Sequence, residues 1–585
     1  MTTYFEVHER DGLARHGEVR LSESVSTPAL VGTDGTVPVR DAGSRWTEER
    51  DAPEGDEGAL TVLSHRSLPP GTPSDVEEAF AVDYPEVSFP NAVVVSPATA
   101  ADYDADAYVL AGAPGYAGHA AAFVEAMVTL TEATPADSAR YLPGVATPAN
   151  VATLVYAGAD LLDADYAYVR GTEGFYLTAD GEHFLEDLEE LPCACPACQQ
   201  PVETFDHEDC AEHNVHALRA QLRTVRKRIR DGRLRDYVEG QARHEAWLTA
   251  TFRRLDDRWG FIEERTPVIR QGELLSATED TLRRVEIRRF ADRVTARYRN
   301  RFDAPMVLVP CAARKPYSES QSHRQFHDAI QWRGHVVSMT SPIGVVPQEL
   351  ELTYPAQHYD SVVTGRWSET ELSFVSEVLA RYLERNDYPE LVAHVPEDYR
   401  PICERVEDRL GVSFTYTVED HPTTEASLSN LADALSGYDA YRKRTREHNT
   451  LRAVADYQFG DGAGDLLFDD IATEGRLPKL RVTSDGEQLA TLVAKYGVLA
   501  FTLAGGKRWV ESDAPTKTVD IDAFVPSGSV LAPGVVDASD DIRVGDEVVV
   551  DGPKAFAVGR AEMSGPEMAE STRGIAVQVR HSEEK

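Results

Sequence analysis

The sequence predicts a multidomain α/β protein whose last segment is a compact β-barrel. Up to about residue 190, short apolar runs such as 91–95 and 107–110 alternate with helix-like segments such as 119–131. This alternation is typical of parallel strands joined by helices. With 585 residues, of which 42% are hydrophobic, the chain has enough material for roughly three to five domains.

A charge-rich helical region over residues 217–300 connects the first α/β unit to a second one. Predicted strands at 306–309 and 391–394 and a helix over 369–383 define the second unit, which ends near residue 436. A helix over 441–457, the stretch GDGAGD and further strand-like runs then indicate a small α+β domain. The final segment has strands separated by Gly, Pro and Asp turns, as in small β-barrels. The predicted domains are residues 1–265, 266–436, 437–510 and 511–585.

The charge balance indicates a protein of a halophilic archaeon. Acidic residues outnumber basic ones 98 to 59, the net charge is −39, and no lysine precedes Lys227. Hydrated carboxylates keep a surface soluble where salt screens charges within a few ångströms, although an acidic mesophilic protein is the alternative. A nucleic-acid partner is not excluded, because counterion release contributes little in strong salt and local arginine clusters and stacking can replace it.

Localisation and redox state also follow from the sequence. The amino terminus has no apolar signal region and no long apolar stretch occurs, so we expect a cytoplasmic protein without a membrane partner. Six cysteines are too few for a disulfide scaffold, and three of them lie within six positions. That crowding favours metal binding.

Cys193, Cys195 and Cys198 form the pattern C-x-C-x-x-C. Three thiolates and one more ligand suit tetrahedral Zn²⁺, which we predict as a structural cofactor. The residues alone leave the fourth ligand open among His207, Cys210, His213 and His216.

This pattern, followed by His213 and Asn214, resembles the structural zinc site of tRNA-guanine transglycosylases, and the resemblance implies that His213 is the fourth ligand. Residues 144–178 resemble the segment in which that family carries a catalytic aspartate, at the position of Asp163, and 26–31 (STPALV) resembles the start of its barrel. The resemblance covers about the first 260 residues and implies a degenerate (β/α)8 TIM-like barrel.

One departure from that family bears on activity. A Ser-Asp-Gly-Gly-Phe stretch, which supplies the family's second catalytic aspartate, is missing between residues 31 and 140. Displacement at a glycosidic bond needs both a nucleophile and a group that manages protons on the base. We therefore do not expect base exchange, and we predict that Asp163 contacts the substrate.

A second candidate site lies in 307–327 (VLVPCAARKPYSESQSHRQFH), where an apolar strand runs into Cys311. In open α/β sheets ligands bind beyond the carboxyl ends of strands. Arg314 and Lys315 would favour the thiolate form of Cys311, and His323 could carry protons. The alternative is a turn with solvated charges and a packed cysteine.

The same segment resembles the signature of archaeosine synthases. The matching residues are Pro310, Cys311, Lys315, Pro316, Tyr317, Ser318, Ser320, Ser322 and His323. The resemblance extends along the chain, and it implies an enzyme that converts the nitrile of 7-cyano-7-deazaguanine in the D-arm of tRNA toward the amidine of archaeosine. It further implies an amino donor such as lysine and a radical-SAM partner protein, and it allows a homodimer.

From this resemblance we predict catalytic and substrate-binding residues. The predicted catalytic residues are Cys311, Lys315, Ser318, Ser320, Ser322 and His323. The predicted substrate-binding residues are Arg314, Tyr317 and Asp163, with Glu349, Tyr354, Gln357 and His358 as further candidates for the pocket wall.

Residues 521–581 resemble the PUA domain of tRNA-modifying enzymes through Gly528-Ser529, Pro533-Gly534-Val535, Gly545-Asp546-Glu547 and Gly559-Arg560-Ala561. This implies RNA binding by a small barrel whose glycines let the backbone approach RNA. Two other functions stay open at this point. One is a non-catalytic subunit that presents tRNA to a partner, and the other is an active tRNA-guanine transglycosylase.

Overall fold

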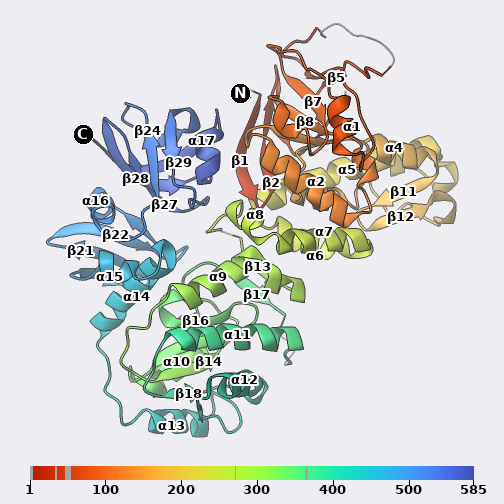
Figure 1. The fold of residues 1–585 in the computed structure, drawn as a ribbon. Coiled ribbons are helices and arrows are strands. Elements are labelled where there is room, and N and C mark those ends of the chain that lie inside the picture. The colour runs from red at the N-terminus through yellow and green to blue at the C-terminus, as the bar shows by residue number, and fades with distance from the viewer. Residues whose placement is uncertain (1–3, 33–35, 47–53, 271, 363–365) are drawn as a thin grey trace. The chain divides into compact units, whose positions relative to one another are not determined.

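The computed structural model describes residues 4–32, 36–46, 54–270, 272–362 and 366–585 (Figure 1). The chain divides into two compact units. The first is residues 1–267, and the second is residues 268–585 except for 531–533 and 566–576, which group with the first. Within the described ranges, no helix combines the length and the apolar character that a membrane span requires.

A parallel sheet in the order β4-β10-β9-β8-β7-β6-β5 forms the centre of the first unit. Its strands are β4 (Ala29–Leu30), β5 (Val39–Asp41), β6 (Leu60–Val62), β7 (Asn91–Val95), β8 (Ala107–Leu110), β9 (Ala139–Leu142) and β10 (Leu161–Leu162). A parallel bridge between Val31 and Val37 links the two edges, and the Val37 N–H donates to Leu30 O at 2.9 Å. The multidomain α/β prediction is confirmed, and the barrel is degenerate, with seven strands in this sheet of the described chain.

The helices of the first unit pack around this sheet. They are α1 (Ser74–Ala79), α2 (Ala120–Ala133), α3 (Val151–Tyr156), α4 (Asp165–Thr172), α5 (His207–Arg230), α6 (Leu234–Gln241), α7 (Ala246–Asp257) and α8 (Trp259–Glu264). A three-stranded antiparallel sheet of β1 (Phe5–Asp11), β2 (Ala14–Arg20) and β3 (Ser24–Thr27) precedes the barrel. Buried Arg235 on α6 binds Asp256 on α7 through two 2.8 Å hydrogen bonds and so joins these helices.

A five-stranded sheet in the order β16-β15-β14-β18-β19 begins the second unit. Four strands are parallel, namely β14 (Met306–Pro310), β15 (His335–Thr340), β18 (Leu391–Ala393) and β19 (Thr415–Tyr416), and β16 (Gly344–Pro347) is an antiparallel edge. The strands predicted at 306–309 and 391–394 are confirmed. The helical prediction over 217–300 is wrong in one place, where β13 (Leu274–Ser276) pairs in parallel with β17 (Tyr359–Ser361).

Helices pack on both faces of this sheet, as the alternation of side chains along β14 requires. Met306 and Leu308 share a core with α9 (Val285–Ala296), α11 (Glu369–Arg385) and α12 (Arg400–Leu410). Val307 and Val309 pack against α10 (Gln321–Ile330) and α13 (Glu425–Ala434) on the other face. After β14 the chain crosses to β15 on one side and later to β18 on the other. The strand order therefore reverses beside β14, which creates a topological switch point.

The C-terminal part contains two further sheets. The first is antiparallel, with β20 (Ala472–Arg476), β21 (Lys479–Ser484), β22 (Glu487–Val493) and β23 (Val498–Phe501), beside α14 (Lys443–Phe459), α15 (Ala463–Leu467) and α16 (Leu503–Glu511). The second, in the order β25-β29-β28-β27-β24-β26, consists of β24 (Thr518–Ile521), β25 (Ser529–Leu531), β26 (Val535–Ala538), β27 (Glu547–Asp551), β28 (Ala555–Ala561) and β29 (Ile575–Glu584), with α17 (Gly565–Glu570). The helix predicted at 441–457 is confirmed as α14.

Candidate functional site

Cys311 lies at the switch point of the second unit's sheet. It directly follows β14, and its N–H donates to Met339 O on β15 at 3.2 Å. Its Sγ lies 3.7 Å from the hydroxyl oxygen of Tyr399, in the segment after β18. The thiol is therefore positioned by the central strand and both of its neighbours, where open α/β sheets bind ligands.

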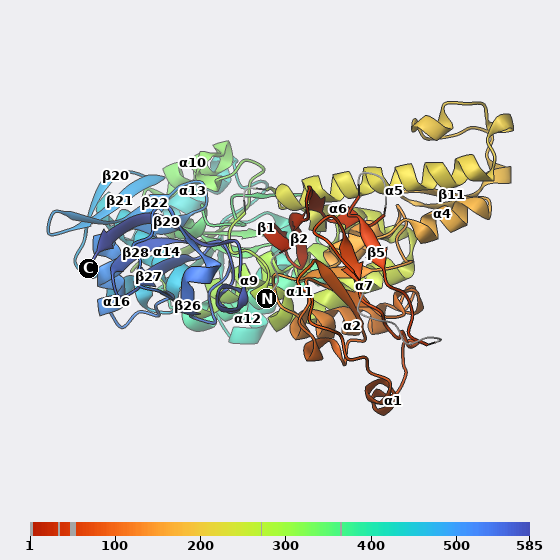
Figure 2. The same cartoon turned by 90° about the horizontal axis from the view of Figure 1, so that it is seen from above.

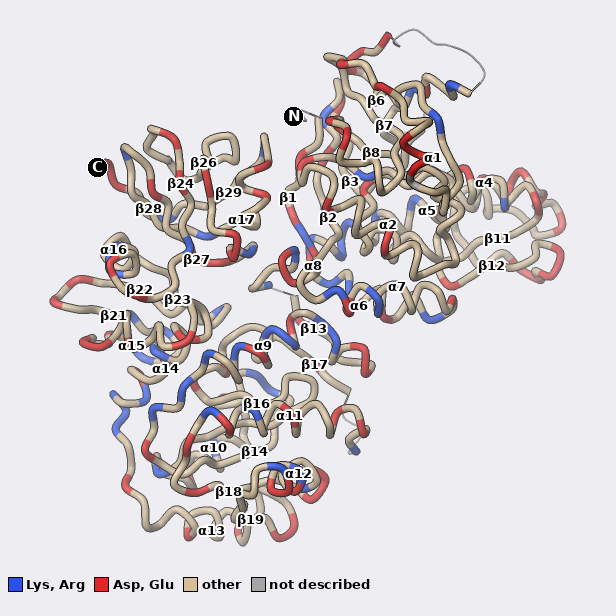
Figure 3. Tube along the Cα trace, in the orientation of Figure 1, with Lys and Arg blue, Asp and Glu red and all other residues tan. Residues whose placement is uncertain are grey.

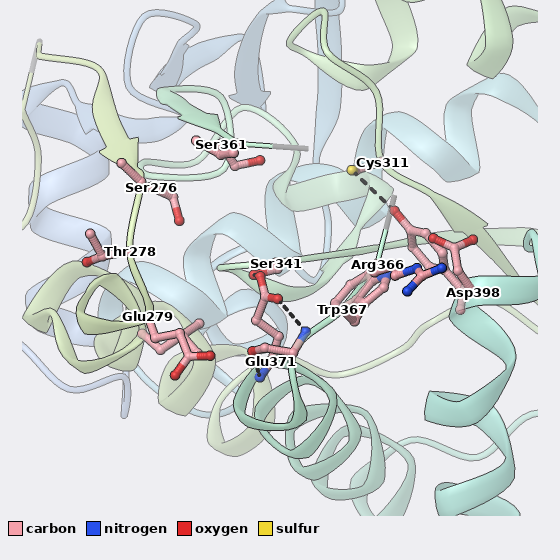
Figure 4. A pocket seen from close by; sticks show the side chains of 15 residues that line it. Ser276, Thr278, Glu279, Cys311, Ser341, Ser361, Arg366, Trp367, Glu371 and Asp398 are labelled. Atoms are coloured by element: carbon pink, nitrogen blue, oxygen red, sulfur yellow. Dashed lines mark hydrogen bonds between the residues drawn. The ribbon is translucent and has the colours of Figure 1, made fainter. Parts of the chain in front are cut away.

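A pocket of about 310 Å³ opens at this point, and Cys311 lines it (Figure 4). The carboxyl ends of several parallel strands contribute to its wall, because parallel strands end at the same edge of a sheet. These contributions are Ser276 from β13, Ser341 after β15, Ser361 from β17, and Asp398 and Tyr399 after β18. The remaining lining residues are Ala277, Thr278, Glu279, Leu282, Val362, Arg366, Trp367, Ser368 and Glu371.

The first turn of α11 forms another wall of the pocket. Ser368 caps the helix by accepting from the Glu371 N–H at 3.2 Å, and Glu371 Oε2 accepts from the Ser368 N–H at 2.8 Å. The other oxygen of Glu371 accepts from the Ser341 hydroxyl at 2.6 Å. The ring of Trp367 meets that of Tyr399 edge to face at 4.7 Å. This capping box holds the wall rigid beside Cys311.

The charged side chains that line the pocket are three carboxylates and the guanidinium of Arg366. Carboxylates of Glu279, Glu371 and Asp398 line it, and the Asp398 carboxylate accepts no hydrogen bond from the described residues. Burial raises the pKa of Tyr399, and the charge of Cys311 raises it further, so the phenol stays protonated and can donate to a thiolate. Aromatic faces and carboxylates together attract organic cations.

Lys315 lies near the pocket but not in its wall. Its Nζ is 3.9 Å from the centre of the Tyr359 ring, and burial lowers its pKa while the nearby Cys311 opposes that shift. Arg314 is exposed and pairs with Glu319 at 2.7 Å. Both basic residues follow Cys311 closely in sequence, and the charge of Cys311 acts on Lys315.

The other predicted site residues build the turn between β14 and α10. Tyr317 is buried, with its hydroxyl 2.7 Å from that of Tyr359. Ser320 caps α10 by accepting from the His323 N–H at 3.2 Å, and the buried His323 ring bonds Pro310 O at 3.0 Å. Burial lowers the pKa of His323 to about 4, so the ring is neutral and its N–H donates to that carbonyl.

Two serines complete this turn. The Ser318 N–H donates to Glu351 at 2.9 Å, and the Ser322 hydroxyl lies 3.3 Å from that of Ser320. The structure thus brings the signature together around the end of β14, but of its predicted catalytic residues only Cys311 lines the pocket.

The other pocket candidates lie elsewhere in the second unit. Buried Glu349 pairs with His335 at 2.9 Å, and Gln357 donates to Ala494 O at 2.9 Å. Tyr354 is buried and lies beside His358, with ring centres 5.9 Å apart. These four residues pack the domain, and none lines the pocket.

A separate cluster in the first unit fits a metal ion. One ligand atom from each of Cys193, Cys195, Cys198 and His213 lies within 4.8 Å of the others. His213 Nδ1 is 3.5 Å from Cys195 Sγ and 3.4 Å from Cys198 Sγ. The loop that carries Cys193, Cys195 and Cys198, here called the cysteine loop, lies beyond the start of α5, as Figure 2 shows.

The surroundings of His213 orient it as a ligand. Its Nε2–H donates to Leu177 O at 2.9 Å, which leaves the lone pair of Nδ1 directed at the sulfurs. The Tyr176 ring stacks on it at 3.7 Å. Next to it, Asn214 accepts from the Leu177 N–H at 2.8 Å and donates to Phe175 O at 2.9 Å. Side chains of α5 therefore satisfy the outer edge of β11 (Phe175–Thr178), whose other edge pairs with β12 (Gly181–Phe184).

The three alternative ligands named from the sequence do not join this cluster. His207 Nδ1 is bonded to Thr172 O at 3.0 Å, and the buried Cys210 and the partly exposed His216 lie outside the group. The fourth ligand that the transglycosylase resemblance implied is thus the one brought into place.

Asp163 directly follows β10 and is almost fully buried. One of its oxygens accepts from the Tyr141 hydroxyl at 2.9 Å and from the Gly144 N–H at 2.8 Å, and the other accepts from the Asp165 N–H at 3.2 Å. Both oxygens thus stabilise the loops after β9 and β10.

Comparison with known proteins assigns a family. An archaeosine synthase of Haloferax volcanii is 63% identical, with the whole of each chain covered. The chain belongs to the archaeosine synthase family. An archaeosine synthase subunit alpha of Methanosarcina acetivorans is 41% identical over 99% of each chain, and a tRNA-guanine(15) transglycosylase of Methanothermobacter thermautotrophicus is 29% identical over 78% of this chain and 68% of its own.

Family models match four segments of this archaeosine synthase family member. Residues 89–246 match queuine tRNA-ribosyltransferase, 449–515 match the patch-forming domain C2 of tRNA-guanine transglycosylase, and 520–582 match the PUA domain. Residues 287–435, which contain Cys311, match a domain of unknown function. The PUA-type domain expected from the sequence is confirmed.

Several residues that line the pocket were not predicted, although four of them carried a signal in the sequence. Ser368 and Glu371 form the S-x-x-E pattern that marks the start of a helix. Asp398 and Tyr399 follow the predicted strand at 391–394, as Cys311 follows its own strand. Ser276 and Ser361 carried no comparable signal, because short strands in polar surroundings have little periodicity.

Proposed function

We propose that this chain adds an amino donor such as lysine to the nitrile of 7-cyano-7-deazaguanine in the D-arm of tRNA, with Cys311 as the nucleophile. Its archaeosine synthase relatives support a role in forming archaeosine in tRNA. The observation that carries the finer proposal is the position of Cys311, at the switch point and in the wall of a pocket lined by carboxylates.

The proposed reaction has two steps and no net redox change. The Cys311 thiolate adds to the nitrile carbon, the new C–S bond forms, and the nitrogen takes a proton from a solvent water to give a thioimide. The donor amine then attacks the same carbon and the C–S bond breaks, so its electron pair returns to sulfur. The product is an amidine that carries the donor as a substituent. A partner of the radical-SAM class would then release the unsubstituted amidine of archaeosine.

Neighbouring side chains support the thiolate and the deprotonation of the amino donor. The Tyr399 hydroxyl, 3.7 Å from Cys311 Sγ, donates to the thiolate and keeps it directed into the pocket. Asp398, whose carboxylate has no hydrogen bond from the described residues, accepts the proton of the incoming ammonium. Lys315, close to the pocket, interacts electrostatically with Cys311.

The remaining residues of the signature would hold Cys311 in place. Ser318, Ser320, Ser322, Tyr317 and His323 hold the turn that fixes Cys311 at the end of β14. Arg314 is exposed, which suits contact with an RNA phosphate. Asp163 contributes to the shape of the barrel loops and not to base exchange.

We propose Zn²⁺ as the metal of the Cys193, Cys195, Cys198 and His213 cluster, since three thiolates and one imidazole form a closed tetrahedral set that serves structure. Metal analysis should find about one zinc per chain. His213→Ala should lose the metal, whereas His207→Ala, in the first turn of the same helix, should retain it. The reverse pattern would exclude His213 as a ligand.

The decisive experiment uses the purified full chain in high salt with tRNA that carries the cyano base and with candidate amino donors. The mass of the nucleoside should rise by that of the donor, and quenching without a donor should trap RNA on the protein. Cys311→Ala should abolish both signals. Cys403→Ala, at a buried cysteine in α12 outside the pocket, should retain both.

Two other outcomes identify the competing functions. Full modification by Cys311→Ala in the presence of a partner protein would favour a subunit that only presents tRNA. Incorporation of labelled free base into tRNA that lacks it would favour a transglycosylase, as the 29% identical relative is named. The engagement of both Asp163 oxygens by backbone and phenol donors argues against that outcome. A homodimer stays a prediction.

A further inference from the structure

An exposed tryptophan stands at the end of α10. Trp332 has 41% of its surface exposed, and both it and the preceding Gln331 have left-handed backbone conformations, with φ of 64° and 49°. Such a conformation is unfavourable for a bulky side chain. A strained, solvent-facing indole is a feature that folding alone does not require, and strain of this kind is frequent at binding sites.

A basic segment begins beside this indole, because the Tyr441 N–H bonds to Trp332 O and four basic residues follow Tyr441. Arg442, Lys443, Arg444 and Arg446 occupy four of five successive positions at the start of α14, in a chain whose net charge is −39. The guanidinium carbon of Arg446 lies 5.1 Å from the centre of the Trp332 ring. In Figure 3 the start of α14 stands out as a stretch of blue. We call Trp332 and these four residues the Trp332 patch.

Contacts beneath the indole make the patch rigid. The Tyr441 N–H donates to Trp332 O at 2.9 Å, and the two rings meet edge to face at 5.7 Å. The Tyr441 ring also packs on Phe302 at 4.7 Å. The indole therefore presents a fixed surface, so that a ligand stacking on it loses less conformational freedom in the complex.

Little acidic charge neutralises the patch. Lys443 lies 3.4 Å from Glu447, but Arg444 donates to the His448 ring at 3.3 Å and Arg442 has no acidic partner among the described residues. Arg442, Lys443 and Arg444 are exposed. On a protein with 98 acidic side chains, a local excess of cations beside an aromatic face indicates a polyanion with planar groups.

We propose that the Trp332 patch binds tRNA by stacking one unpaired base on the Trp332 ring while the basic side chains contact the adjacent phosphates. The inference rests on the proposed function for the identity of the RNA. Stacking on an aromatic side chain and local cations still operate in strong salt, where long-range attraction is screened. The Trp332 patch is also linked to the turn that follows Cys311. The charge of Arg446 acts on Glu351, and the Glu351 carboxylate accepts from the Ser318 N–H in that turn.

The test measures binding of the full chain to an unmodified tRNA transcript over a series of salt concentrations. Trp332→Ala should weaken binding about 5- to 100-fold, as expected for the loss of one stacked base, and Trp332→Phe should restore most of it. Arg442→Gln with Arg444→Gln should reduce the slope of log K against log salt by about 1.4, or about 0.7 for each lost phosphate contact.

The matched control removes two exposed arginines from the same sheet domain. Arg405→Gln with Arg409→Gln, on α12, should leave affinity and slope unchanged, since both side chains pair with glutamates. Equal losses in this control would mean that only net charge matters and would overturn the proposal. Unchanged tRNA affinity of a folded Trp332→Ala variant would overturn it too, as would binding of an acidic peptide in preference to tRNA. The nucleoside mass is measured separately at saturating tRNA, where weaker binding no longer limits the reaction. This measurement distinguishes a failure of the proposed chemistry from a failure of tRNA binding at the patch.

Discussion

Asn214 provides the sharpest test of how the metal cluster is supported, because it contacts no metal ligand atom yet fixes the strand that orients one. Asn214→Ala leaves Cys193, Cys195, Cys198 and His213 in place. It removes the partners of the Leu177 N–H and of Phe175 O, which face away from β12. At about 1 to 3 kcal/mol for each unsatisfied buried group, folding stability should fall by about 2 to 6 kcal/mol.

The same change should loosen the metal. Leu177 O accepts from His213 Nε2, so movement of β11 misdirects the ligand nitrogen, and losses of this kind lower zinc affinity about 10- to 100-fold. The assay compares the transfer of zinc to a colorimetric chelator, and the urea midpoint, between Asn214→Ala and Gln199→Ala. Gln199 is the control because its exposed amide donates to Ala194 O in the cysteine loop. Equal release rates and equal midpoints in the two variants would refute the reasoning.

Three further predictions concern the second unit. Tyr399→Phe removes the hydroxyl 3.7 Å from Cys311 Sγ and should slow alkylation of that thiol by iodoacetamide several-fold, while an unchanged rate would remove Tyr399 from the proposed mechanism. Ser368→Ala removes the cap of α11 and should lower the free energy of unfolding in urea by about 1 kcal/mol. Ser373 is exposed on the same helix, and Ser373→Ala should leave the stability unchanged. Equal effects of the two substitutions would contradict the capping role. Burial lowers the pKa of His323 and His394 to about 4. As the pH falls below about 6.5, these two histidines are therefore protonated in the unfolded state before they are protonated in the folded state. Between pH 6.5 and 5 the two together should lower the free energy of unfolding by up to about 3 kcal/mol per pH unit. Unfolding midpoints that stay constant over that range would show that these rings are not held neutral.

Local patterns were sufficient for some of these features. The metal cluster was predictable because three of its ligands lie within six positions, so the chain between them is too short to place them far apart. The strand before Cys311 was predictable from its continuous apolar run, and the position of a thiol at its carboxyl end followed directly. His213 needed the family resemblance, since spacing left four candidates.

The rest of the pocket depended on strand order, which local patterns do not encode. Ser341, Asp398 and Tyr399 reach Cys311 only because β15 and β18 flank β14 on opposite sides. The sequence predicts Ser320 and His323 as catalytic residues because their side chains are reactive. In the structure the helix that begins at Gln321 uses Ser320 as its cap, and the imidazole of His323 is buried. The sequence predicts a catalytic or binding role for many residues of this segment, whereas only Cys311 among them lines the pocket.

Every side chain that lines the pocket in the described part of the chain comes from one stretch of sequence, residues 276–399. The chemistry proposed for this pocket is therefore encoded in a single contiguous piece of gene, whereas a site assembled from distant segments would need coordinated changes in all of them.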